Sequence, residues 1–97
     1  MEKLVRDNIP EIIEKNEGVK PKIRTANKEY NNKLKDKLKE EVKEFLKSED
    51  SEELVDILEV IYALGKEKGL SKEEIEDLRV KKLIKKGGFD KKIILED

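Results

Sequence analysis

Four regularly spaced carboxylates are the residues of this chain best suited to chemistry. They are Glu41 and Glu44, then Glu53 and Asp56, so that the members of each pair are three positions apart. On a helix, residues three apart are separated by about 4.5 Å of rise and lie on the same side. Both side chains of a pair can therefore reach one ion, and hard divalent cations such as Mg²⁺ favour carboxylate oxygens.

The two pairs are also symmetric about the short turn predicted between them. Glu44 and Glu53 are equally distant from its midpoint, and so are Glu41 and Asp56. If the flanking stretches form antiparallel helices, the four carboxylates meet at one level and repel one another unless a cation neutralises them. The pattern predicts a metal site for Mg²⁺, with Mn²⁺ as an alternative ion.

Two simpler interpretations of the same residues stay open. Acidic residues among lysines are typical of a solvated helix surface, and Asp50 followed three positions later by Glu53 fits a helix capping box. The neighbours of the second pair favour a metal site, because Glu53 and Asp56 project between apolar residues in helical register. Glu52 and Glu59 instead share a polar stripe that is expected to face water.

Apolar periodicity and turn residues predict the elements that position these carboxylates. A first helix is expected from Asp7 or Asn8 to Gly18, and a fourth from the capping box of Ser71 and Glu74 to just before Gly87. The two middle helices are expected at residues 28–47 and from 52 to 66 or 68. A turn of about four residues makes them antiparallel neighbours.

The predicted architecture is a single domain, 1–97, of the all-α class. We expect a four-helix bundle with a small two-stranded accessory, in which residues 92–95 pair with residues 20–25. The middle helix that carries Glu53 and Asp56 is apolar over most of its surface, which favours a central position or an interface with another subunit.

Composition limits the possible functions. Charged residues make up 48% of the 97, but 23 basic and 24 acidic side chains nearly cancel, so bulk charge does not favour a nucleic acid or a membrane as partner. With neither Cys nor His, acid–base or metal chemistry must use carboxylates, lysines or hydroxyls. No signal peptide or long apolar run is evident, so a cytoplasmic protein is expected. Hydrophobic content of 35% is low, and self-association would bury more surface.

Segments along nearly the whole chain resemble one enzyme family. Residues 37–44 (KLKEEVKE) and 52–59 (EELVDILE) resemble the EExxE…ExxD signature of the all-α NTP pyrophosphohydrolases, the MazG-like superfamily. The opening 3–10 (KLVRDNIP) and the ending 86–91 (KGGFDK) are similar to the small house-cleaning branch, which is related to phosphoribosyl-ATP pyrophosphohydrolase. The stretch between the two acidic motifs is shorter than usual for that family, and Asn8 stands where Lys is frequent.

The resemblance implies a fold and an activity. A MazG-like helical bundle would assemble as a homodimer or tetramer and use Mg²⁺ to hydrolyse a noncanonical nucleoside triphosphate to monophosphate and diphosphate. By position, Glu41, Glu44, Glu53 and Asp56 would be the metal ligands, with Glu40 the first acid of the motif. Glu41 or Glu44 is also the expected catalytic base for the attacking water.

Basic side chains are expected to bind the substrate phosphates. Lys3 and Arg6 are candidates at the start of the chain, with Asp7 predicted to orient Arg6 by a salt bridge. Lys82 and Lys86 are candidates for a second basic rim, supplied by the fourth helix or by a neighbouring subunit. For each group the alternative is an ordinary solvated surface.

Aromatic side chains are candidates for stacking a nucleotide base. They are Tyr30, Tyr62, Phe45 and Phe89, of which Phe45 and Tyr62 fit a core or interface better.

Two rival functions remain from the sequence. Phosphoribosyl-ATP hydrolysis in histidine biosynthesis shares the same chemistry. A non-catalytic helical interaction module would instead use its apolar stripe to bind a partner and leave the acids solvated or paired with lysines.

Overall fold

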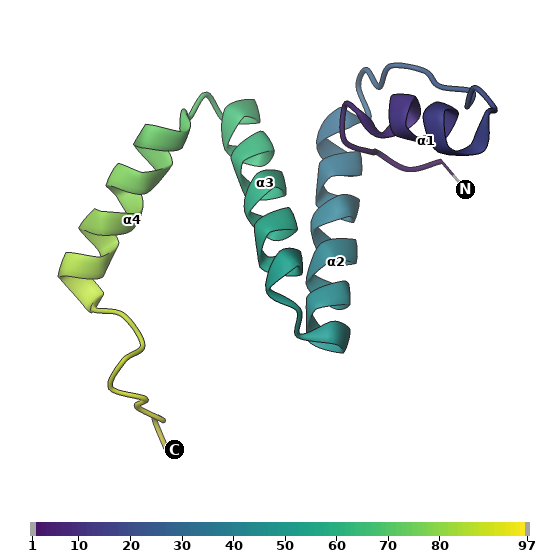
Figure 1. Cartoon of the computed structure of the whole chain (residues 1–97). Coiled ribbons are helices and arrows are strands. Elements are labelled where there is room, and N and C mark those ends of the chain that lie inside the picture. The colour runs from purple at the N-terminus through teal and green to yellow at the C-terminus, as the bar shows by residue number, and fades with distance from the viewer. Residues whose placement is uncertain (1, 97) are drawn as a thin grey trace.

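A computed structural model describes residues 2–96, and this part of the chain contains four helices and no strand (Figure 1). The helices are α1 (Ile9–Glu17), α2 (Tyr30–Ser48), α3 (Ser51–Glu67) and α4 (Lys72–Lys86). The all-α class predicted from the sequence is confirmed. No helix among the described residues combines the length and apolar character needed to cross a membrane.

The helix ends follow the local sequence signals. Helix α1 has Pro10 in its first turn, where the missing N–H costs nothing, and ends at Gly18 in the left-handed conformation. Helix α4 begins with the predicted capping box, in which the Ser71 hydroxyl accepts from the Glu74 amide at 3.1 Å and the Glu74 carboxylate accepts from the Ser71 amide at 3.1 Å.

Helices α2 and α3 form an antiparallel hairpin that is the centre of the molecule (Figure 1). Only Glu49 and Asp50 connect them, so the predicted four-residue turn was too long. Helix α2 continues to Ser48 and Glu49 reverses the chain at a φ of 57°. Leu34 of α2, 2% exposed, and Val60 of α3 are the buried hydrophobic residues of the described chain.

The segment before α1 is fixed to the start of α2. Arg24 donates to Glu2 at 2.8 Å and to Glu29 at 2.5 Å, and Lys33 of α2 donates to the Glu2 carbonyl at 3.1 Å. The hydrogen bonds from Arg24 lower the pKa of Glu29 to about 2. Glu2 therefore lies beside the start of α2, and further along the same segment Arg6 reaches Asp56 of α3.

Helix α4 packs only against α3 among the helices, through a close approach at Gly65. A methyl group at this position would collide with the side chain of Ile75. The glycine thus permits α4 to lie against the end of α3, and the rest of α4 extends away from the hairpin (Figure 1).

The predicted two-stranded accessory is wrong. Residues 20–25 and 92–95 have no strand geometry and lie at opposite ends of the molecule (Figure 1). Ile23 and Leu95 are largely exposed, so the alternation of apolar residues has no sheet or core to face. An isolated pair of strands is at best marginally stable in water, which is why weak local patterning does not suffice here.

The four helices do not close into a bundle within one chain, contrary to the prediction. The radius of gyration is 17.3 Å, against about 13 Å for a compact domain of this length. The accessible surface is 9222 Å², roughly 3,500 Å² more than a folded monomer of this mass is expected to expose. The exposed surface includes a row on α3, made of Leu54, Leu58 and Ile61.

Candidate metal centre

Three of the four predicted carboxylates converge at the middle of the α2–α3 hairpin. Glu41 of α2 and Glu53 and Asp56 of α3 each place one carboxylate oxygen within 4.8 Å of the others. The antiparallel arrangement brings Glu41 opposite the first two turns of α3, as the symmetry about the turn predicted. The spacing is suited to a single hard cation held by oxygen ligands.

Two oxygens of this triad lack a hydrogen-bond partner. Glu41 is only 6% exposed, and the Oε2 atoms of Glu41 and Glu53 are buried without a donor. An unpaired buried carboxylate oxygen is costly, and a bound cation removes that cost. The three carboxylates therefore form a group that could hold a metal ion.

The electrostatics of the triad are those of crowded negative charges. Burial, and then the charges of Glu44 and Asp56, raise the pKa of Glu53. Glu44 is exposed and lies outside the group of three, but it is close enough to Glu53 to contribute to this shift. A cation at the triad would reverse the effect and favour the ionised form.

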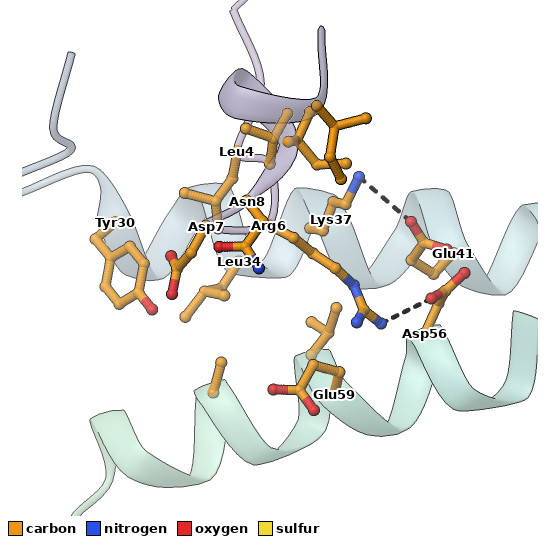
Figure 2. A pocket seen from close by; sticks show the side chains of 15 residues that line it. Leu4, Arg6, Asp7, Asn8, Tyr30, Leu34, Lys37, Glu41, Asp56 and Glu59 are labelled. Atoms are coloured by element: carbon orange, nitrogen blue, oxygen red, sulfur yellow. Dashed lines mark hydrogen bonds and ion pairs between the residues drawn. The ribbon is translucent and has the colours of Figure 1, made fainter. Parts of the chain in front are cut away.

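Basic side chains border the triad on the side of the N-terminal segment. Figure 2 shows Arg6 donating to Asp56, with Nη2 and Oδ1 2.7 Å apart, and Lys37 beside Glu41 at 3.3 Å. Lys3 lies 3.5 Å from Glu40. The predicted salt bridge between Asp7 and Arg6 is wrong, since Arg6 reaches across to α3 instead.

A cavity of about 540 Å³ lies between the hairpin and the segment that precedes α1, and two members of the triad, Glu41 and Asp56, line it (Figure 2). Arg6, Lys37, Glu41 and Asp56 line one end. Its volume lies in the range of small-molecule sites, which are mostly apolar with a few placed polar groups. The rest of the lining is made of Leu4, Val5, Asp7, Asn8, Ile9, Ile12, Tyr30, Leu34, Glu59, Val60 and Ala63.

The structure separates the predicted substrate-binding lysines. Lys82 and Lys86 are exposed on α4, and neither lines the cavity. Lys37 lies at the site although sequence reasoning did not single it out. Its signal was present, since a Lys four residues before Glu41 shares that helix face.

The capping alternative for Glu53 is not what the structure contains. The Asp50 side chain caps α3 by accepting from the Glu52 amide at 3.0 Å, whereas Glu53 Oε2 is buried and has no partner. The solvated-surface interpretation does fit Glu52, which is exposed. The metal-ligand interpretation therefore fits Glu53 and the solvated-surface interpretation fits its neighbour Glu52, on a different face of α3.

Comparison of the chain with family models, with curated proteins and with solved structures finds no match.

Proposed function

We propose that this protein is a Mg²⁺-dependent nucleoside triphosphate pyrophosphohydrolase, as the resemblance to the MazG-like superfamily implies. The observation that carries the proposal is the partly buried carboxylate triad, whose Glu41 and Glu53 each keep one buried, unpartnered oxygen. A metal site alone does not define a reaction. The adjoining Arg6 and Lys37 and the cavity beside them fit a phosphorylated substrate.

Each residue of the site has its own role in the proposed reaction. Mg²⁺, when bound by Glu41, Glu53 and Asp56, supplies charge neutralisation for the triphosphate. A water oxygen bonds to the α-phosphorus, and the bond from that phosphorus to the bridging oxygen of diphosphate breaks. Glu44, next to the triad but outside it, accepts the proton of the attacking water. Arg6 and Lys37 stabilise the negative charge on the phosphate oxygens.

A homo-oligomer, a homodimer or tetramer, is part of the same proposal. The excess exposed surface and the apolar row on α3 support an interface between copies of the chain. Lys82 and Lys86 could then contribute to substrate binding from a neighbouring subunit. We place the activity in the cytoplasm, where noncanonical nucleoside triphosphates would be its substrates; phosphoribosyl-ATP remains the rival substrate.

A helical interaction module is the second candidate function. The half-exposed Leu54 and Leu58 on α3 favour it, because such a row also fits a foreign partner. In that case the carboxylate triad would have no ligand to bind.

Metal-dependent stability and product identity test the proposal. Mn²⁺ or Mg²⁺ at a hundredfold excess over its Kd should stabilise the protein by about 2.7 kcal/mol, seen as a rise in Tm. A panel of normal, deaminated and oxidised nucleoside triphosphates, with phosphoribosyl-ATP, should yield monophosphate and diphosphate. Asp56→Asn should abolish both effects while helicity is retained, whereas Glu52→Gln, on the solvated face, should abolish neither.

Several outcomes would contradict the proposal. Orthophosphate as product, or no turnover of any substrate in the panel, would exclude a pyrophosphohydrolase. Indifference of the Tm to both metals would favour the interaction module.

A further inference from the structure

The cavity beside the triad has two chemically different ends. Helix α2 contributes Tyr30, Leu34, Lys37 and Glu41, whose spacing of four, three and four residues puts them on one face. Tyr30 and Glu41 are therefore about 16 Å apart along the helix axis. One end of the cavity adjoins Glu41 and Asp56 and holds the basic side chains of Arg6 and Lys37, while the other end, near Tyr30, is removed from them (Figure 2).

Helix α3, which is antiparallel to α2, lines the same cavity from the other side. Helix α3 supplies Asp56 and Glu59 and then Val60 and Ala63, so its lining carries two carboxylates before its last two residues, which are apolar. Between the two ends, the buried side chains of Leu34 and Val60 line the cavity. This part of the cavity offers apolar surface to a ligand whose phosphates would lie near Arg6 and Lys37.

The polar groups at the distal end come from the turn before α1. Figure 2 shows the carboxylate of Asp7 and the ring of Tyr30 at the same end of the cavity, with the amide of Asn8 between them and the charged end. Asp7 forms no ion pair with any cation of the described residues, because its neighbour Arg6 is turned towards Asp56. Its two oxygens are free to accept hydrogen bonds from a ligand.

We infer that this distal end is a nucleobase subsite selective for guanine. The inference rests on the proposed function, since the phosphates of the same nucleotide would occupy the triad end. Tyr30 stacks on the base, and Asp7 accepts from the two adjacent donors on the guanine edge, N1–H and the 2-amino group. Adenine presents a ring-nitrogen acceptor where guanine has N1–H, and an ionised carboxylate cannot donate to it.

Binding of nucleoside monophosphates without metal tests the subsite apart from catalysis. Calorimetric titration should give GMP a Kd about tenfold lower than that of AMP or CMP, a difference of about 1.4 kcal/mol. Asp7→Asn should remove this preference, while Asp36→Asn, an exposed acid on α2 outside the cavity, should keep it. Tyr30→Ala should weaken every monophosphate about tenfold, and Tyr30→Phe should restore the affinity.

The outcomes separate the subsite from the proposed function. Equal affinity for GMP and AMP, no binding of any monophosphate, or an unchanged preference in Asp7→Asn would overturn the subsite even if triphosphates are hydrolysed. Guanine-selective binding that Asp7→Asn removes would establish the subsite even if no triphosphate is turned over, and in that case the hydrolase proposal alone would fail.

Discussion

At the scale of single residues, opposing electrostatic effects act on the carboxylate of Glu53. It lies in the first turn of α3, where an acidic side chain is favoured by the helix dipole. Burial and then the neighbouring carboxylates nonetheless raise its pKa, so these two effects together exceed any contribution of the helix dipole. A residue that strains the metal-free protein and would be relieved by a cation is better explained as a ligand than as a solvated surface residue.

The pKa of Glu53 gives a prediction about stability and pH. Because folding raises this pKa, the folded state binds the proton more tightly than the unfolded chain does, and the resulting stabilisation is lost as pH rises through the raised pKa. Glu53→Gln cannot ionise, so at neutral pH and without metal its Tm should exceed that of the unsubstituted protein. The difference should vanish below about pH 4, where the unfolded carboxyl is also protonated.

Thermal unfolding in a chelating buffer, followed by circular dichroism from acidic to neutral pH, measures this difference. Glu52→Gln is the matched control, since Glu52 shares the first turn of α3 but is exposed. A Tm of Glu53→Gln below that of the unsubstituted protein at neutral pH would show that the Glu53 carboxylate has a structural role.

At the scale of elements, the segment ahead of α1 completes the site. Residues 2–8 contribute no regular helix, but Arg6 and Lys3 contact acidic residues of the hairpin and Asp7 lines the cavity. The anchor formed by Arg24, Glu2 and Lys33 holds the start of this segment against α2. The hairpin thus supplies the carboxylates, and the N-terminal segment supplies basic side chains and covers the cavity.

Because Arg6 contacts a metal-site carboxylate and adjoins the cavity, we predict that Arg6→Ala strengthens the binding of Mn²⁺ and weakens that of the nucleotide. Loss of a positive charge 2.7 Å from Asp56 should strengthen Mn²⁺ binding several-fold, because the cation no longer competes with Arg6 for that carboxylate. The same substitution should raise the KM for the nucleotide about tenfold, since a phosphate contact is lost. Calorimetry with Mn²⁺ and steady-state kinetics measure the two effects.

Arg79→Ala is the matched control, because Arg79 forms its ion pair with Glu76 on α4. It should alter neither quantity. If Arg6→Ala weakened Mn²⁺ binding instead, Arg6 would be holding Asp56 in position rather than competing for it.

The sequence predicted those elements whose signals are local. Capping at Ser71, the stop at Gly18 and the hairpin symmetry about the turn all follow from neighbouring residues, and the convergence of Glu41, Glu53 and Asp56 follows in turn. The partner of Arg6 could not be predicted in this way. It depends on how the N-terminal segment crosses the hairpin, a contact between residues 50 positions apart.

The predicted pairing of residues 20–25 with 92–95 failed for a related reason. Alternating apolar residues indicate a strand only where a sheet or core is available to bury one face. Here Ile23 and Leu95 face solvent, and the helices between them keep the two segments apart.

At the scale of the whole molecule, the unclosed arrangement of helices bears on the proposed homo-oligomer. Leu54, Leu58 and Ile61 follow one another at four and three residues on α3 and so form a single face. Asp56, Val60 and Ala63 occupy a different face of the same helix, where they line the cavity. A second copy can therefore cover the apolar row and leave the metal site and its cavity accessible.

The area supports an extensive interface. A standard interface buries about 800 Å² on each partner, and obligate dimers bury more than this. The excess surface of roughly 3,500 Å² per chain exceeds the standard value several-fold. Copies of the chain would then be held together by much of the apolar surface that a compact monomer keeps in its core, and folding would be coupled to association.

Coupled folding and association predict a Tm that rises with protein concentration. Light scattering should give the mass of a dimer or tetramer, and Leu58→Glu should shift it towards the monomer and lower the Tm, because a charge would be buried at the interface. Val19→Glu is the control, since Val19 is exposed in the loop after α1 and should change neither mass nor Tm. A monomeric mass together with a concentration-independent Tm would mean that the apolar row on α3 serves a different partner. The interaction module would then be the better account of this surface.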